Sequence, residues 1–324
     1  MSTFYTHITG NKIKSVLLMG FLPLILLFIL LIATSASSYA GQGHFDWPQI
    51  EKMLLGILPF VLILSLVWAL IAWYLGDRMI LGFSGAKPLE KKSNSAIYNL
   101  VENLAITAGL PTPKIYILND DSLNAFATGR NPNKASLALT TGIISKLNKQ
   151  ELESVIGHEM SHIGNYDIRF MLVAIIMVGV IQFVADIALR NFYYGNRSRS
   201  SDDHGGGGVI LLAVILIYLL GFVGTVLVQL AISRKREFMA DASSAQLTRN
   251  PLSLASALRK IATDSKLEIL KGKKSIGHLC IADPFKDSRN LENPALKKSN
   301  WFLRLWQTHP PILERVQALE EMGS

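Results

Sequence analysis

Long uncharged apolar stretches constrain this chain more than any other feature of its sequence. Residues 15–34 and 53–76 are each long enough to cross about 30 Å of hydrocarbon as a helix. Residues 209–232 form another such stretch, and residues 170–189 form one that two polar residues interrupt. With 50% hydrophobic and 17% charged residues, the 324-residue chain is too apolar for one ordinary soluble domain. The sequence therefore predicts an integral membrane protein with four spans.

Some of these stretches allow another interpretation. The first follows Lys12 and Lys14 and could be a signal peptide, although its apolar run exceeds the usual core of about 7–15 residues. Residues 170–189 and 209–232 could form a hairpin that dips into the bilayer instead of crossing it. Their length favours spanning.

The basic residues beside the apolar stretches predict the orientation, because loops rich in Lys and Arg stay in the cytoplasm. These residues gather before the first stretch, after the second and after the fourth: Lys12, Lys14, Arg78, Lys87, Lys91, Lys92, Arg234, Lys235 and Arg236. With four spans, both termini would face the cytoplasm. Contact of these residues with anionic lipid largely explains the net charge of +8, so the bilayer is an expected partner and nucleic acid is not.

The run His158-Glu159-Met160-Ser161-His162 is the strongest chemical signal in the chain. On a helix its two imidazoles share one face and can reach one metal ion, with Glu159 facing a nearby water. Asn148 and Glu151 predict a capping box that opens this helix. Apolar residues at helical spacing predict its buried face: Leu152, Val155, Ile156, Met160 and Ile163. The pattern predicts a zinc hydrolase, and a purely structural histidine pair is the alternative.

A catalytic zinc site needs a third protein ligand and an open position for water. The other histidines lie in the N-terminal tail, in loops or far downstream, so a carboxylate is the better candidate. Glu237 and Asp241 are four residues apart on an expected helix. Glu237 could bind zinc while Asp241 accepts the N–H of a liganding imidazole. A charged helix start with an internal ion pair is the alternative.

The chain outside the membrane stretches predicts a split α+β domain. We expect an N-terminal membrane region over 1–76, a membrane pair over 169–232, and one cytoplasmic domain built from 77–168 and 233–324. Strands are expected at 114–118, 124–128 and 136–139, and helices at 142–147, 251–265 and 311–322. The predicted fold class is a mainly α membrane protein with an α+β cytoplasmic domain, in which a small sheet accompanies the helix that carries the two histidines.

Three motifs together resemble the HtpX-type integral membrane zinc endopeptidases. They are HEMSH, the later SRKREFMAD, and the earlier Asn124-Ala125-Phe126-Ala127-Thr128-Gly129. The similarity runs over nearly the whole chain, as far as Thr308-His309-Pro310-Pro311. The resemblance implies a zinc metalloprotease in which the metal ligands are His158, His162 and Glu237, the general base is Glu159, and the supporting carboxylate is Asp241.

The resemblance also implies roles for residues outside the metal motifs. His309 would stabilise the oxyanion and Arg315 would position the site, although His309 could instead cap the last helix. A sheet edge over Asn124, Ala125, Phe126 and Ala127 would bind an extended peptide, although these residues could simply be sheet core. The implied substrates are proteins or peptides, in particular misfolded or damaged membrane proteins cut on the cytoplasmic side during quality control and stress response.

Two alternative functions differ from this reading. A prenyl-protein (CAAX) protease is a related enzyme, but that family carries more spans than the four expected here. A silent membrane scaffold or chaperone that only binds metal is the non-enzymatic alternative, and the presence of Glu159 argues against it. Cys280 is the only cysteine, which excludes an internal disulfide and a cysteine-rich metal site and suits a reducing cytoplasm.

Overall fold

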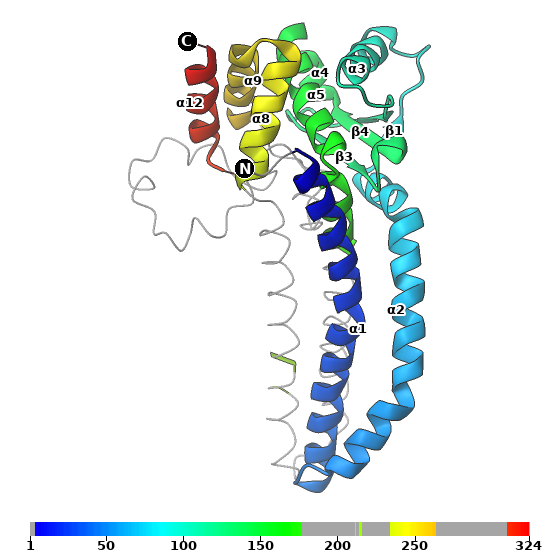
Figure 1. Ribbon diagram of the computed structural model, residues 1–324. Helices are drawn as coiled ribbons and strands as arrows, with labels where there is room; N and C mark the ends of the chain where they lie inside the picture. Colours follow the sequence, from blue (N-terminus) through cyan, green and yellow to red (C-terminus); the bar gives the residue numbers. More distant parts are fainter. Residues whose placement is uncertain (1–3, 177–210, 212–213, 216–233, 264–309, 324) are drawn as a thin grey trace. The chain divides into compact units, whose positions relative to one another are not determined.

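Two long helices open the described part of the chain (Figure 1). The computed structural model describes residues 4–176, 211, 214–215, 234–263 and 310–323. Helices α1 (Phe4–Gln42) and α2 (Trp47–Ser84) contain the first two predicted apolar stretches and are joined by a short turn. Both are long and apolar enough to cross a membrane, by length and composition. The predicted stretches 170–189 and 209–232 lie largely outside the described residues, and His309 lies wholly outside them.

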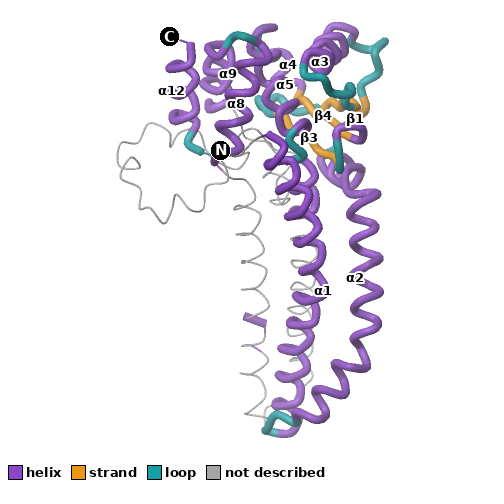
Figure 2. Tube along the Cα trace, in the orientation of Figure 1, coloured by secondary structure: helices purple, strands orange, loops and turns teal. Residues whose placement is uncertain are grey.

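A four-stranded mixed sheet forms from the three predicted strand segments and one further strand (Figure 2). Its strands are β1 (Lys87–Pro88), β2 (Lys114–Leu118), β3 (Ala125–Gly129) and β4 (Ala135–Thr140), in the order β1-β2-β4-β3. β2 and β4 are parallel, and the other two pairs are antiparallel. The predicted strands are thus confirmed to within a residue or two at their ends, while β1 was not predicted. Within the described residues β3 pairs only with β4, so it is an edge strand.

Three helices follow the sheet segments in the first half of the chain: α3 (Ser95–Thr107), α4 (Thr141–Lys146) and α5 (Lys149–Gly164). The predicted capping box of α5 is confirmed, because the Asn148 side chain accepts from the Glu151 backbone and the Glu151 side chain accepts from the Asn148 backbone. The predicted apolar face of α5 is buried in one core with the sheet. α5 therefore has a fixed start and a fixed rotation against β3 and α3.

Three further helices complete the described chain: α8 (Arg234–Thr248), α9 (Pro251–Thr263) and α12 (Ile312–Gly323). α8 and α9 both contact α5, and α12 contacts α8 and α9. Leu254, Leu258 and Ile261 of α9 are fully buried in the same core as the apolar face of α5. Helices that precede α5 in the sequence (α3) and helices that follow it (α8 and α9) are thus packed against it.

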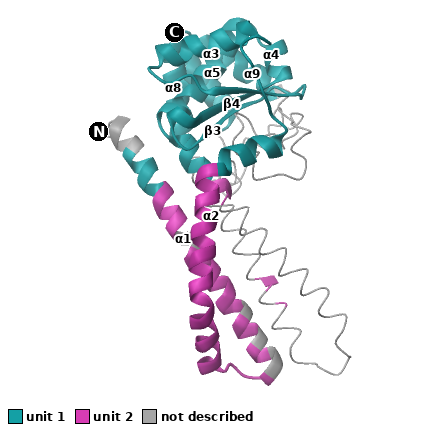
Figure 3. Ribbon diagram, turned by 90° about the vertical axis from the view of Figure 1, so that its right-hand side faces the viewer, with its two compact units in different colours: residues 1–14, 75–172, 228–324 teal, residues 15–74, 173–227 magenta. Residues whose placement is uncertain are grey.

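The chain divides into two compact units (Figure 3). One contains residues 1–14, 75–172 and 228–324, which include the sheet and the helices around α5. The other contains residues 15–74 and 173–227. In the second unit Val173 is buried against Leu18 and Leu26 of α1 and Trp68 of α2. Along the chain, each segment of the second unit is preceded and followed by residues of the first unit.

Candidate metal centre

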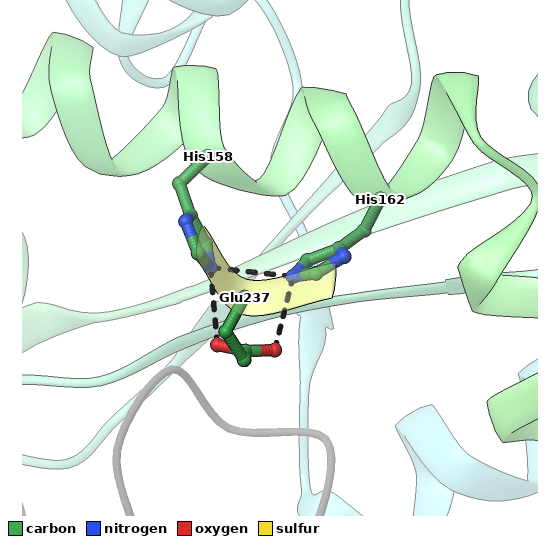
Figure 4. A group of neighbouring side chains, drawn as sticks. All are labelled: His158, His162 and Glu237. Carbon is green, nitrogen blue, oxygen red and sulfur yellow. Dashed lines mark hydrogen bonds and ion pairs between the residues drawn. The ribbon is translucent and has the colours of Figure 1, made fainter. Parts of the chain in front are cut away.

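Three side chains direct donor atoms at a common point (Figure 4). His158 and His162 come from successive turns of α5, and Glu237 comes from the first turn of α8. The two Nε2 atoms are 3.2 Å apart, and the Glu237 oxygens lie 3.7 Å from Nε2 of His158 and 3.6 Å from Nε2 of His162. Ligand atoms placed tetrahedrally around zinc at about 2.0–2.1 Å lie roughly 3.3 Å from one another. Two imidazoles and one carboxylate at these spacings therefore fit a zinc-sized cation.

Small residues let α8 approach α5 closely enough for Glu237 to reach the histidines. The Ser244 hydroxyl of α8 donates a 2.6 Å hydrogen bond to the backbone carbonyl of Ser154 on α5. A Cβ atom added at Gly157 would lie only 3.0 Å from that hydroxyl oxygen. Ala240 is fully buried between Glu237 and Asp241 along α8. The spacing between the two helices thus depends on the absence of side-chain bulk beside His158.

His158 is held by a buried ion pair. Its Nδ1 lies 2.9 Å from Asp241, and Arg315 of α12 donates to both oxygens of the same carboxylate at 2.8 and 2.6 Å. All three side chains are nearly inaccessible to solvent. Burial alone would raise the pKa of Asp241, but the charge and hydrogen bonds of Arg315 lower it. An ionised Asp241 holds Nδ1–H of His158 as a donor, which leaves Nε2 free to bind a metal.

His162 is held by a different carboxylate, which the sequence analysis missed. Its Nδ1 lies 3.1 Å from Asp167, five residues further along the chain. The other oxygen of Asp167 accepts a 2.8 Å hydrogen bond from the side-chain amide of Asn11 on α1 and lies 3.6 Å from Nε of Arg236. An aspartate shortly after the second histidine was the only sequence signal for this contact.

Glu159 lies between the two histidines on α5 and is buried. Burial, together with the charge of Glu237, raises the pKa of Glu159 to about 7, against the lowering effects of His162, of a hydrogen bond from the backbone N–H of Ala127 and of Arg315. A carboxyl group with a pKa near neutrality can both accept and return a proton at physiological pH.

The predicted edge strand contacts this carboxyl group at Ala127. β3 begins at Ala125, and Asn124 precedes it with its side-chain oxygen accepting from the Ala125 backbone N–H. Ala127 supplies the backbone N–H that reaches Glu159. Phe126 is 1% exposed, so the strand is buried along its length. The structure thus brings Ala127 to Glu159 and Arg315 to Asp241, while Asn124, Ala125 and Phe126 lie further along the same segment.

The charges around the candidate centre favour a cation. Three carboxyl groups, those of Glu237, Asp241 and Asp167, lie within contact distance of a histidine ring. Two guanidinium groups, those of Arg315 and Arg236, lie beside these carboxylates. With both histidines neutral, as metal binding requires, the three ionised carboxylates exceed the two guanidinium groups by one negative charge, and ionisation of Glu159 adds another. A divalent cation would balance this excess.

Comparisons with known proteins give a consistent result. Peptidase family M48 matches residues 91–323. "Protease HtpX homolog" of Bacteroides fragilis (strain YCH46) is 39% identical over 323 residues, covering 98% of each chain. The protein of the same name from Lactobacillus helveticus (strain DPC 4571) is 36% identical over 327 residues, covering 98% of this chain and 99% of its own. The crystal structure of S. mikatae Ste24p aligns with a TM-score of 0.47 and 19% identity, covering 98% of this chain and 67% of that chain.

The site and these relatives define a membrane metalloprotease. More particularly, the chain belongs to peptidase family M48 and is similar to the HtpX proteases over nearly its whole length. The resemblance inferred from the three motifs is therefore confirmed, and so is its implication that the protein acts on protein or peptide substrates.

Proposed function

We propose that this protein is a zinc-dependent endopeptidase in which His158, His162 and Glu237 bind the metal. The observation that carries the proposal is the convergence of two Nε2 atoms and one carboxylate from helices distant in sequence, all within 4.8 Å of one another. Two nitrogens and one oxygen are a typical donor set for catalytic zinc. Bound there, zinc supplies a Lewis acid that polarises a peptide carbonyl and makes water acidic enough to attack near neutral pH.

Glu159 has the properties of the general base. Its pKa of about 7 lets it take a proton from the attacking water and deliver it to the leaving amine. Asp241 keeps the ring of His158 oriented, and Arg315 keeps Asp241 ionised and in place. His309, which would share the oxyanion charge, remains a proposal from sequence.

The edge strand β3 is the proposed substrate platform. Among the described residues β3 pairs only with β4, so an extended peptide could pair along its other edge, where the backbone of Ala127 contacts Glu159. Binding over residues 124–127 would bring the scissile bond near the base. The strand would then position the peptide through main-chain hydrogen bonds, which is compatible with broad sequence tolerance.

We further propose that the protein cuts misfolded or damaged membrane proteins on the cytoplasmic side of a bacterial-type inner membrane. Residues 1–76 and 169–232 would be the membrane regions, and 77–168 with 233–324 the cytoplasmic protease domain. Two observations support this arrangement. Along the chain, residues of the first unit precede and follow each segment of the second unit. If the first unit lies on one side of the membrane, each segment would cross the membrane an even number of times. Basic residues flank the proposed inner ends of the spans.

Digestion of casein by the purified full-length protein tests the proposed chemistry. Glu159→Gln should lower the rate by about 100-fold or more, the contribution of a general base, while the zinc content stays at that of the parent. Glu153→Gln on the same helix is the matched control, because Glu153 is half-buried outside the metal group, and it should retain activity. Equal activity in the parent and Glu159→Gln would refute the assignment.

Two further measurements test the metal and the orientation. Glu237→Ala should lose bound zinc, and zinc retained at the parental level would remove Glu237 from the ligand set.

A fluorescent protein fused to the C-terminus should fold and fluoresce in the cytoplasm, whereas a C-terminal alkaline phosphatase should be inactive there. An active phosphatase fusion would overturn the proposed topology. Cleavage of a prenylated CAAX peptide in preference to casein would favour the alternative protease class.

A further inference from the structure

The turn that ends α5 has an unusual backbone. α5 ends at Gly164, and residues 167–176 form the next helical stretch. Between them Tyr166 has a φ of 60°, a left-handed conformation that carries strain in a residue other than glycine. The Tyr166 backbone N–H donates to the Ile163 carbonyl at 3.2 Å. This turn places Asp167 against His162 on the preceding helix.

Asp167 is buried, and both of its oxygens have partners. One oxygen lies 3.1 Å from Nδ1 of His162. The other accepts from the Asn11 amide at 2.8 Å and lies 3.6 Å from Nε of Arg236. The carboxylate is thus fixed from three elements that are far apart in sequence.

Asn11 joins the N-terminal helix α1 to this turn. Its side-chain amide also donates to the backbone carbonyl of Asn165 at 3.0 Å, so one NH₂ group bridges two residues of the turn. Asn11 is 5% exposed, which is unusual for an amide side chain. The next residue, Lys12, places its ammonium 4.3 Å from the centre of the Tyr166 ring. Two consecutive residues of α1 therefore contact the strained turn.

We propose that Asp167 is a positioning residue for His162 and that Asn11 acts through Asp167, so that the N-terminal helix is part of the metal-retaining structure. The inference rests on the proposed role of His162 as a metal ligand. A carboxylate that holds Nδ1–H as a donor fixes the ring and leaves Nε2 for the metal. The side chain of His162 is 17% exposed, so without Asp167 water can take the Nδ1 position and the ring gains freedom.

The positioning role of Asp167 is tested by the zinc affinity of the full-length protein in detergent. Competition with a fluorescent chelator measures this affinity. At a pH above about 9, where a proton on His162 no longer competes with the metal in either protein, Asp167→Ala should weaken zinc binding by about 10- to 100-fold, the usual effect of losing such a partner. Asp167→Asn keeps the shape and an acceptor oxygen, so it should lose less. Activity of both variants should recover toward the parental value as free zinc is raised. Parental zinc affinity in both variants would overturn the proposal, as would activity loss that excess zinc does not restore.

The second part is tested with Asn11→Ala. We expect a several-fold loss of zinc affinity in the parent and no further loss in the Asp167→Ala background, because Asn11 acts through Asp167. Asn94→Ala is the matched control. Asn94 makes a comparable side-chain hydrogen bond at the start of α3, away from the metal group, so it should keep the parental zinc affinity. Equal losses for Asn11→Ala in both backgrounds would refute the coupling.

The same assay separates failure of this inference from failure of the proposed function. Alanine at His158, His162 or Glu237 should abolish measurable zinc binding. If these variants lose zinc while Asp167→Ala does not, only the positioning role is wrong. If the three ligand variants bind zinc as tightly as the parent, the proposed metal site itself is wrong, and the role of Asp167 is overturned with it.

Discussion

The two histidines of the candidate centre are supported in different ways. His158 is 1% exposed and bound to Asp241, whose carboxylate is held by two nitrogens of the buried Arg315. His162 has a 17% exposed side chain and is bound to Asp167, which accepts its shortest hydrogen bond from the neutral amide of Asn11. One histidine is therefore supported by an ion pair from α12, and the other by a tight turn and α1.

This difference separates two requirements of the site. Removing one partner of a buried ion pair leaves an uncompensated charge in a medium of low polarity, which destabilises the whole fold. Removing the neutral amide of Asn11 costs less, because Arg236 still lies beside Asp167 and no charge loses its counter-charge. Changes around His158 should therefore act mainly on folding stability, and changes around His162 mainly on metal retention.

Arg315→Met should have the largest effect on stability. It leaves Asp241 buried without its counter-charge, so the free energy of unfolding of the metal-free protein should fall by about 3–5 kcal/mol. Arg236→Met is the matched change on the other side. It should cost less than half as much, because Arg236 lies 3.6 Å from Asp167 and is partly exposed. Denaturant titration of both variants in detergent provides the measurement, and similar losses would contradict the difference between the two sides.

Replacing both members of the buried pair is the control for this prediction. In Arg315→Met with Asp241→Leu the unpaired charge of Asp241 is gone and only the 3.4 Å contact of Arg315 with Glu237 stays lost, so much of the lost stability should return even though support for His158 is gone. Stability would then be restored without restoring zinc affinity. A double variant as unstable as Arg315→Met alone would show that packing of the arginine, and not its charge, is what α12 contributes.

Close helix packing is the second difference between the two sides. A Cβ at Gly157, next to His158, would lie 3.0 Å from the Ser244 hydroxyl, whereas a Cβ at Gly164, after His162, would make only an ordinary 3.5 Å contact with Leu110. Gly157→Ala should therefore cost about 1–3 kcal/mol by pushing α8 away, and zinc affinity should fall as Glu237 moves with it. Gly164→Ala should be neutral or slightly stabilising, because alanine favours a helix over glycine. Thermal unfolding and zinc competition would measure both.

The sequence predicted the His158 side much better than the His162 side, for a physical reason. The capping box, the buried face of α5 and the spacing of Glu237 and Asp241 are local patterns within single helices. The contact of Asp167 with His162 requires a positive φ at Tyr166. The sequence does not predict this conformation, because the residue is not a glycine. The contact of Asn11 with Asp167 joins residues 156 positions apart and depends on how α1 packs.

The strands show the same limit. β2, β3 and β4 follow from alternating and β-branched or apolar residues between turn signals, and each was predicted. β1 spans only Lys87 and Pro88, and two residues that include a proline give no strand pattern. Its pairing with β2 is a tertiary contact, which a pattern of two residues does not predict.

The protonation of the two rings is the third difference, and it concerns the metal-free protein. Burial lowers the pKa of His158, and the charges of Arg315 and His162 lower it further, against the raising effect of Asp241. For His162 burial also lowers the pKa, but the hydrogen bond with Asp167 and the charge of Glu237 outweigh it and raise the pKa to about 9. The 3.2 Å contact between the two Nε2 atoms suits this arrangement, because a protonated His162 can donate to a neutral His158.

Zinc binding should consequently depend on pH in a way that reports His162 alone. Near pH 7 the metal must displace the His162 proton, so affinity should rise as pH increases, by about tenfold per unit, and level off near pH 9. Chelator competition at several pH values measures the slope, and calorimetry in buffers of different ionisation enthalpy counts the released proton. In Asp167→Asn the plateau should begin at lower pH, because the main group that raises the His162 pKa is lost. An affinity that does not change between pH 7 and 9 would mean that both rings are neutral before the metal arrives, and the two sides would then be equivalent in charge.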